Sequence, residues 1–303
     1  MTGERDDSIE GAKPARGRHR RWWLAATVVL IVIATAGVVA YVFLRESTTP
    51  VDVNEAVSDF RREESSIAAV TTSAPDTTVA GTTVVGTTEV PTTSTAPRPG
   101  SELPAVGVYT YDTNGGESID ALDGRSHRYP DISTITVTHD GCGWVQRWRP
   151  LRERWDATTF CPSRRGMELR VDVNHHEFFG IDDTREFACA ARALYYPART
   201  NPGRTWAARC TFDEIAVVRN GTIVGRRQVE IGGTPVRVLQ FEVHDDITGA
   251  SKGSTDRTIQ VVPETGLLVG LELTTDVEND SPIGHVHYQE HYELQLTSLE
   301  PRR

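Results

Sequence analysis

The sequence predicts a mainly β protein: an antiparallel curved sheet or open half-barrel that follows one transmembrane helix and a disordered stalk. Three observations predict this: an uncharged apolar segment near the N-terminus, a low-complexity Thr/Pro-rich run, and a long C-terminal region of alternating apolar and polar residues. The expected parts are a basic cytoplasmic tail (1–21), a transmembrane helix (22–44), a short amphipathic helix or juxtamembrane segment (45–70), a Thr/Pro-rich disordered linker (71–101) and an extracytoplasmic β-rich domain (102–303).

The apolar segment predicts a membrane anchor. No charged residue interrupts residues 23–44, and a helix of this length, rising about 1.5 Å per residue, spans a hydrocarbon core of about 30 Å. Arginines crowd residues 16–21, whereas the balanced pair Arg45-Glu46 follows the segment. The positive-inside rule therefore predicts a single-pass cell-membrane protein with a cytoplasmic N-terminus and an extracellular C-terminal domain. A cleaved signal peptide is the alternative, but its apolar region would be shorter, which favours an uncleaved signal anchor.

The stalk is expected to carry one short helix followed by a flexible spacer. Val53, Ala56, Val57 and Phe60 recur at three- and four-residue steps, which predicts an amphipathic helix. The following Thr/Pro-rich run lacks large apolar residues and cannot offset its ordering entropy, so we expect it to be disordered. We interpret it as a spacer that holds the domain away from the membrane, with O-glycosylation of its threonines as an alternative.

Within the outer domain, apolar and polar residues alternate in short runs separated by turn residues. Turn signals are Asn220-Gly221, Gly232-Gly233 and the sequence Pro263-Glu264-Thr265-Gly266. The expected strands are 106–111, 133–138, 143–149, 167–173, 186–196 (ambiguous with helix), 205–212, 214–219, 222–230, 236–244, 257–262, 267–275 and 285–296. In the last strand the even positions are apolar except Glu290, so this face is expected in the core and the odd face against water or a ligand.

The cysteines predict disulfide bonds. Cys142, Cys161, Cys189 and Cys210 all lie outside the membrane in the predicted topology, and an even number of cysteines in an oxidising compartment favours disulfides. Sequential pairing would close two loops of about twenty residues, each worth about 3 kcal/mol in the chain-entropy model; the other two pairings stay open. The tryptophans near these cysteines are expected to pack in the core.

Composition and motifs exclude several classes of function. The net charge of −10 argues against a nucleic-acid partner. The chain has no His-Glu-x-x-His or phosphate-loop motif, and no catalytic residues are assigned and no cofactor is expected.

Two segments are candidates for binding. His285 and His287 would share one face of a strand about 7 Å apart and could chelate a metal with a third ligand from elsewhere, although a solvent-facing polar strand is favoured. Residues 174–180, with Phe178 and Phe179, either shape a ligand rim or form a loop whose phenylalanines pack into the core, and the second is favoured.

Part of the domain resembles known periplasmic proteins. Residues 213–300 resemble the curved-sheet repeat of LolA-like and RseB-like proteins through the strand–turn–strand sequence Val262-Pro263-Glu264-Thr265-Gly266-Leu267-Leu268 and the closing strand that ends at Leu296. This resemblance implies a concave face that binds acyl chains or peptides, although the cysteine-bearing half departs from the pattern. The anchor, stalk and cysteine-rich half also resemble uncharacterised actinobacterial single-pass membrane proteins, which implies a cell-envelope location.

We therefore expect a membrane-anchored envelope module that binds a lipid, a glycolipid or an envelope protein on its sheet without catalysis. The alternatives are a metal-dependent envelope enzyme that uses His285 and His287, and a structural or adhesion module. The sequence assigns no ligand-binding residue.

Overall fold

The structure, a computed structural model, describes residues 48–72, 102–121, 124–281 and 284–303. The chain divides into two compact units between Ser47 and Thr48, and the second unit is the one described. The predicted tail, the transmembrane helix at 22–44 and most of the predicted linker lie outside the described residues and stay predictions. Within the described ranges, no helix is both long and apolar enough to cross a membrane.

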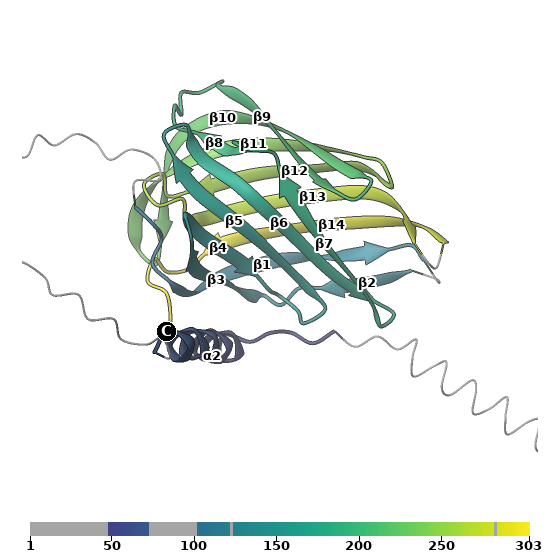
Figure 1. The fold of residues 1–303 in the computed structure, drawn as a ribbon, viewed down its shortest axis with the longest axis horizontal. Helices are drawn as coiled ribbons and strands as arrows, with labels where there is room; N and C mark the ends of the chain where they lie inside the picture. Colours follow the sequence, from purple (N-terminus) through teal and green to yellow (C-terminus); the bar gives the residue numbers. More distant parts are fainter. Residues whose placement is uncertain (1–47, 73–101, 122–123, 282–283) are drawn as a thin grey trace, which may run out of the picture. The chain divides into compact units, whose positions relative to one another are not determined.

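The described unit consists of one helix and a single antiparallel sheet (Figure 1). The helix is α2 (Val53–Thr72), and the first strands are β1 (Gly107–Ile119), β2 (Arg125–Arg128), β3 (Ile132–Asp140), β4 (Gly143–Trp148), β5 (Arg154–Ser163), β6 (Gly166–Phe178) and β7 (Ile181–Cys189). The remaining strands are β8 (Leu194–Pro197), β9 (Thr205–Phe212), β10 (Ile215–Ile231), β11 (Thr234–Thr248), β12 (Ser251–Val261), β13 (Leu268–Ser281) and β14 (Gly284–Leu296).

The sheet closes into a barrel, which corrects the predicted open half-barrel. Twelve strands form the ring, with β2 and β8 paired beside it, and the ring closes where β1 meets β14 from Tyr111↔Leu296 to Ile119↔Tyr288. Strand β1 extends well beyond the predicted 106–111, so its first half pairs with β3 and its second half with β14. Closure leaves no exposed edge strand in the ring, and the local pattern of one strand does not specify that distant partner.

The predicted turn at Asn220-Gly221 is wrong, because β10 runs through both residues and pairs with β9 on one side and β11 on the other. Gly221 is needed for packing instead: a Cβ there would lie 2.2 Å from the ring of Trp206. The turn at Gly232-Gly233 is confirmed, since it joins Ile231 to Thr234 and both glycines have positive φ, as a tight hairpin requires.

Two other strand predictions need correction. The ambiguous segment 186–196 is not helical: β7 ends at Cys189, and β8 begins at Leu194 after a turn. Strand β5 was not predicted at all, because its Arg154-Trp155-Asp156 beginning does not follow an apolar alternation.

Inward side chains fill only one half of the barrel. We call this the packed half; it is the half that contains the buried rings of Tyr111, Trp148, Tyr196, Phe241 and Tyr292. The rings of Trp148 and Tyr292 stack at 4.3 Å, and such aromatic contacts add to the free energy gained by burial. Figure 1 shows β4–β7 in front of β11–β14, the two walls that enclose this core.

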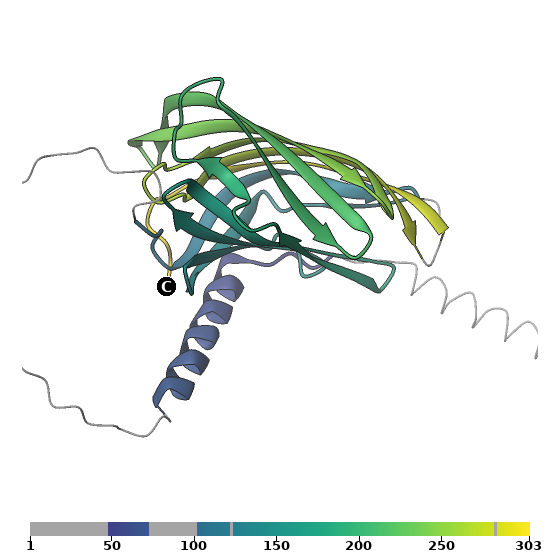
Figure 2. The ribbon, with the colours of Figure 1, turned by 45° about the horizontal axis from the view of Figure 1, so that its top comes forward.

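The helix α2 packs on the other face of β1. Ala56, Val57 and Phe60 are buried with Val51 and Val108 in a small second cluster. The carboxylate of Asp52 accepts hydrogen bonds from the backbone N–H groups of residues 54 and 55, at 2.7 and 2.9 Å, which caps the helix start. Ion pairs from Asp59 to Arg149 and from Glu55 to Arg152 tie the helix to the segment after β4. Figure 2 shows α2 beside the barrel, with its N-terminal end nearest the sheet.

Candidate functional site

The second half of the barrel, which we call the open half, contains a cavity of about 430 Å³. Its lining changes with depth. Apolar side chains form what we call the apolar wall: Ile119, Phe178, Val217, Ile247, Val277 and Val286. Charged side chains form what we call the ionic floor, between the wall and the packed half: Arg154, Asp156, Asp172, Arg219, Asp245, Arg257 and Glu290.

A β-bulge in β6 determines which side chains reach this cavity. Met167 and Leu169 are buried in the packed half, and the pairing with β5 then shifts register so that Arg170 is the extra residue. Beyond the bulge the inward positions change from odd to even, so Asp172 and Asn174 face the cavity. An extra residue in one strand re-aims the side chains that follow, and here it lies at the boundary between the two halves.

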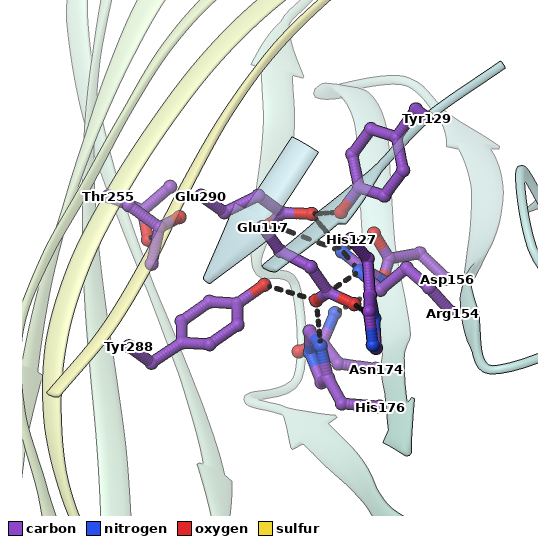
Figure 3. A network of polar contacts seen from close by, with 11 residues as sticks. Glu117, His127, Tyr129, Arg154, Asp156, Asn174, His176, Thr255, Tyr288 and Glu290 are labelled. Carbon is purple, nitrogen blue, oxygen red and sulfur yellow. Dashed lines mark hydrogen bonds and ion pairs between the residues drawn. The ribbon is translucent and has the colours of Figure 1, made fainter. Parts of the chain in front are cut away.

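One part of the ionic floor is the Arg154 centre, which we define as Arg154 with the carboxylates of Glu117, Asp156 and Glu290. Arg154 is fully buried and donates to both oxygens of Asp156 and, at 3.0 and 3.2 Å, to both oxygens of Glu290. Its Nε lies 3.6 Å from Oε2 of Glu117. One guanidinium therefore faces three carboxylates (Figure 3).

Glu117 is the most enclosed of these carboxylates and is held by neutral and charged donors. Nδ1 of His127 and Nδ1 of His176 each lie 2.8 Å from its oxygens, and the hydroxyl of Tyr288 donates at 2.9 Å (Figure 3). Burial alone would raise the pKa of Glu117, but the hydrogen bonds from both histidines and the nearby positive charge lower it well below its ordinary value. Because an ionised carboxylate only accepts, both histidines donate through Nδ1.

The pKa of Glu290 is shifted in the opposite direction. Burial raises the pKa of this carboxyl, and the charges of Glu117 and Asp156 raise it further against the opposing effect of Arg154. Tyr129 donates its hydroxyl to Oε1 of Glu290. In contrast, the pKa of Asp156 is lowered, because the charge of Arg154 outweighs the effect of burial. Glu290 is therefore the carboxyl of the Arg154 centre that takes up a proton most readily.

The other part of the floor is the Arg219 centre, which we define as Arg219 and Arg257 with Asp172 and Asp245. Arg219 donates to both oxygens of Asp245 at 2.8 Å and lies 3.4 Å from Asp172, and Arg257 also donates to Asp245. Burial would raise the pKa of Asp245, but the two arginines lower it below its ordinary value. Two arginines face two aspartates here, so this centre is balanced in charge.

The structure places His285 and His287 on the outer face of β14, away from the cavity. Each histidine has its own carboxylates on β13: Nε2 of His287 lies 2.7 Å from Asp276, and His285 lies near Asp280 and Glu278. Among the residues that the structure describes, no three or more His, Cys, Asp or Glu side chains gather where they could hold a metal ion. The metal site stays a prediction without a third ligand in these ranges.

The alternation predicted for the last strand is confirmed. Val286, Tyr292, Leu294 and Leu296 are buried and the odd positions face outward, while the one polar exception, Glu290, is buried in the ionic floor. Residues 174–180 are not the predicted loop, since β6 runs to Phe178, and the predicted packing of both phenylalanines in the core is wrong, because Phe179 is only partly buried and Phe178 lines the cavity. The ligand rim stays a prediction. Phe178 is buried and stacks on His127 at 4.3 Å, and Asn174 and His176 of the same segment line the cavity.

The cysteines form two disulfides with the sequential pairing, Cys142–Cys161 and Cys189–Cys210, which confirms the predicted disulfide bonds. Cys189 and Cys210 lie directly opposite each other in β7 and β9. Disulfides persist in oxidising compartments, which fits an extracytoplasmic location.

Sequence reasoning missed most of the floor. Arg154 and Asp156 lie in the strand that was not predicted, and Glu117 lies beyond the predicted end of the first strand. A signal was present for Arg219 and Asp245, which occupy inward positions of β10 and β11, but charged residues at such positions give no indication by themselves that they meet.

Comparisons with known proteins add little to this geometry. No protein-family model matches the chain, and no curated protein matches it. Among solved structures, the chain matches the hypothetical lipoprotein YmcC from Escherichia coli (K12) with 11% sequence identity and a TM-score of 0.29. The match covers 65% of this chain and 91% of the YmcC chain. A TM-score this low carries no argument about fold or function, so the LolA-like resemblance stays a prediction.

Proposed function

We propose that the β-barrel domain is a non-catalytic binding module that takes a small amphipathic molecule into the open half of its barrel. The observation that carries this proposal is the cavity of about 430 Å³ with an apolar wall above an ionic floor. Its volume falls within the range of roughly 300–1,000 Å³ that is typical of small-molecule sites.

The two kinds of lining favour a ligand with two kinds of surface. An apolar body against Val217, Ile247 and Val277 would gain roughly 25 cal/mol for each Å² removed from water. A polar end is needed at the floor, because covering buried charged groups with apolar atoms would strip their remaining water without replacing its hydrogen bonds. A purely apolar ligand would match the apolar wall but not the ionic floor, and a purely polar ligand would match the floor but not the wall.

Binding without catalysis is supported by the state of the floor. Its carboxylates bond to arginines within the floor, an arrangement typical of a structural ion network, and all four cysteines are in disulfides. The cavity-lining Ser251, the central residue of Gly249-Ala250-Ser251-Lys252-Gly253, donates its hydroxyl to the side-chain oxygen of Asn279 and accepts a hydrogen bond from Arg185, so no general base activates it as a nucleophile.

We also propose that the domain works at the outer side of a cell membrane. The predicted signal anchor at 22–44 and the two disulfides support this. Of the partners expected from the sequence, a single-chain lipid or a small glycolipid fits the enclosed cavity better than an envelope protein, because the cavity lies within the barrel.

The proposal can be tested by filling the cavity. Val217→Trp places an indole in the apolar wall, and Val224→Trp places the same side chain on the exposed outer side of the same strand. The full chain would be purified from its native membrane in a non-ionic detergent, and bound small molecules would be extracted and measured by mass spectrometry.

We expect an amphipathic molecule to copurify with the native chain and with Val224→Trp but not with Val217→Trp, provided that all three show the same circular dichroism spectrum. Equal amounts with both tryptophan variants, or none with the native chain, would refute a ligand in the barrel.

A further inference from the structure

We infer that the polar end of the ligand is cationic: a protonated amine or guanidine that sits at the Arg154 centre against Glu290 and Asp156. This inference rests on the proposed function and specifies the class of its ligand. It is carried by the balance of charge in the cavity, by the place where that balance is broken, and by the kind of hydrogen-bonding atoms left at the floor.

Negative groups outnumber positive ones around the cavity. Seven carboxylates and four arginines line it, together with His176, but Asp182, Asp183 and Asp280 are exposed to water. The excess that is shielded from water is that of the floor, where four carboxylates and three arginines line the cavity and the buried Glu117 lies beside Arg154. In a partly enclosed site of low effective dielectric constant, an excess of carboxylates attracts a cation and repels an anion much more strongly than in water. An anionic head group such as a carboxylate or phosphate would therefore be repelled by the negative electrostatic potential of the cavity.

The excess is local to one side of the floor. At the Arg219 centre two arginines face two aspartates, whereas at the Arg154 centre one arginine faces Glu117, Asp156 and Glu290. Of these three carboxylates, Asp156 and Glu290 line the cavity. A cation next to them would supply the positive charge that this centre lacks.

The surroundings of Glu290 couple binding to proton release. The charged and titratable groups that face it are Arg154 and Asp156 from β5, Glu117 from β1, His176 from β6, Tyr129 after β2, and Tyr288 and Tyr292 from its own strand. Because the pKa of Glu290 is raised in the free protein, a bound cation would lower it again and expel a proton. Affinity for a cation should then increase as pH rises through the pKa of Glu290.

Hydrogen-bonding capacity points to the same class of ligand. The N–H groups of Arg154 are directed at Asp156 and Glu290, and those of Arg219 at Asp245 and Asp172. His176 donates through Nδ1 to Glu117, so in its neutral form Nε2 is an acceptor. On the side of the Arg154 centre the floor therefore offers acceptors to a ligand, which suits ammonium and guanidinium groups, since these only donate.

The test uses three soluble probes with one apolar body: 4-phenylbutylamine, 4-phenylbutanol and 4-phenylbutyrate. Binding to the full chain in a non-ionic detergent would be measured by calorimetry at neutral pH, with Val217→Trp in the same detergent as the blank. We expect the amine to bind at least roughly tenfold more tightly than the alcohol, as a hydrogen bond to a charged group implies, and the carboxylate to bind most weakly.

Two variants assign the effect to the floor. Glu290→Gln keeps the size and the acceptor of the side chain but removes its charge, and should bring the affinity for the amine close to that for the alcohol. Glu278→Gln removes the same charge from the exposed outer face of β13 and should leave the preference intact. Calorimetry of the native chain between about pH 5 and about pH 8, in pairs of buffers with different heats of ionisation, should show proton release with the amine only, in the part of this range where Glu290 is protonated in the free protein. This measurement tests Glu290 even if its variant fails to fold.

The outcomes separate the two proposals. If all three probes bind equally, or the carboxylate binds best, and Val217→Trp abolishes binding, the cationic ligand is refuted while the barrel remains a binding site. If amine binding releases no proton anywhere between about pH 5 and about pH 8, Glu290 is not its partner and the inference fails. If none of the probes binds to the native chain more than to the blank, both proposals are overturned.

Discussion

Along β14 the inward side chains change character halfway: Leu296, Leu294 and Tyr292 fill the packed half, whereas Glu290 and Val286 line the cavity of the open half. In β14 the alternation is unbroken across both halves, so in this strand the difference lies in the side chains, whereas in β6 the bulge at Arg170 also changes which residues face inward. Close packing in one half provides stability, and the other half carries features that cost stability, namely a cavity and buried ions. Binding function is therefore expected where the barrel leaves its core unfilled.

The largest effect is expected from breaking the charge balance of the open half. Arg154→Met leaves Glu117, Asp156 and Glu290 without their guanidinium and should lower the free energy of unfolding by about 3–5 kcal/mol. Urea denaturation of the full chain, followed by tryptophan fluorescence, measures this loss. Arg149→Met is the control, because its pair with Asp59 is partly exposed and should contribute only about 0–1 kcal/mol. Similar small losses for both variants would mean that the open half is hydrated enough to screen its ions.

A second prediction compares one substitution in the two halves. Leu169 and Leu273 are both buried, but only Leu273 lines the cavity. Leucine-to-alanine changes in cores cost about 2–5 kcal/mol, and the cost is highest where the removed side chain was packed on all sides and leaves a new void. Urea denaturation should place Leu169→Ala near the upper end of this range and Leu273→Ala near the lower end. The same loss at both sites would indicate that the cavity is collapsed in solution.

The disulfides provide a third comparison, because their loops are almost equal in length, with sequence separations of 19 and 21 residues. Replacing both cysteines of either pair by serine should lower the free energy of unfolding by about 3 kcal/mol through the entropy of the unfolded chain. Cys210 also lines the cavity, so any difference between the two double variants reports local packing. No loss for either pair, measured by urea denaturation under oxidising conditions, would exclude a stabilising role.

The smallest effect is expected in the pH dependence of the free energy of unfolding, which should have opposite signs for Glu290 of the Arg154 centre and Asp245 of the Arg219 centre. The folded-state pKa of Glu290 is raised above its ordinary value of 4.5, so its contribution to stability is present below that value and is lost as pH rises through the folded-state pKa. Glu290→Gln should therefore gain stability relative to the native chain as pH rises from about 5 to about 8.

Asp245 supplies the control of opposite sign. Its pKa is lowered, so its contribution is present above the ordinary value of 3.8 and is lost as pH falls through the folded-state pKa. The free energy of unfolding of Asp245→Asn should therefore be lower than that of the native chain at neutral pH and approach it only in acid. Free energies of unfolding of both variants and of the native chain, measured from about pH 2 to about pH 8, test both signs, and parallel curves for Glu290→Gln and the native chain would contradict the raised pKa.

Local patterns in the sequence predicted several features correctly, and for physical reasons. The alternation of the last strand determines which of its faces is buried, and Gly232-Gly233 permits the positive φ values that a tight turn needs. The same kind of local signal failed at Asn220-Gly221. Gly221 is there because the ring of Trp206 leaves no room for a Cβ, and this is a tertiary contact that the local sequence does not show.

By itself, the sequence determined that the C-terminal region is built of alternating strands, that its cysteines suit disulfides, and that Glu290 interrupts an apolar face. Only the tertiary structure decided that β1 closes on β14, that the bulge at Arg170 turns Asp172 and Asn174 inward, and that charges from separate strands meet in one floor. The physical reason is range: alternation is a property of neighbouring residues, whereas closure and the pairing of buried charges depend on residues far apart along the chain.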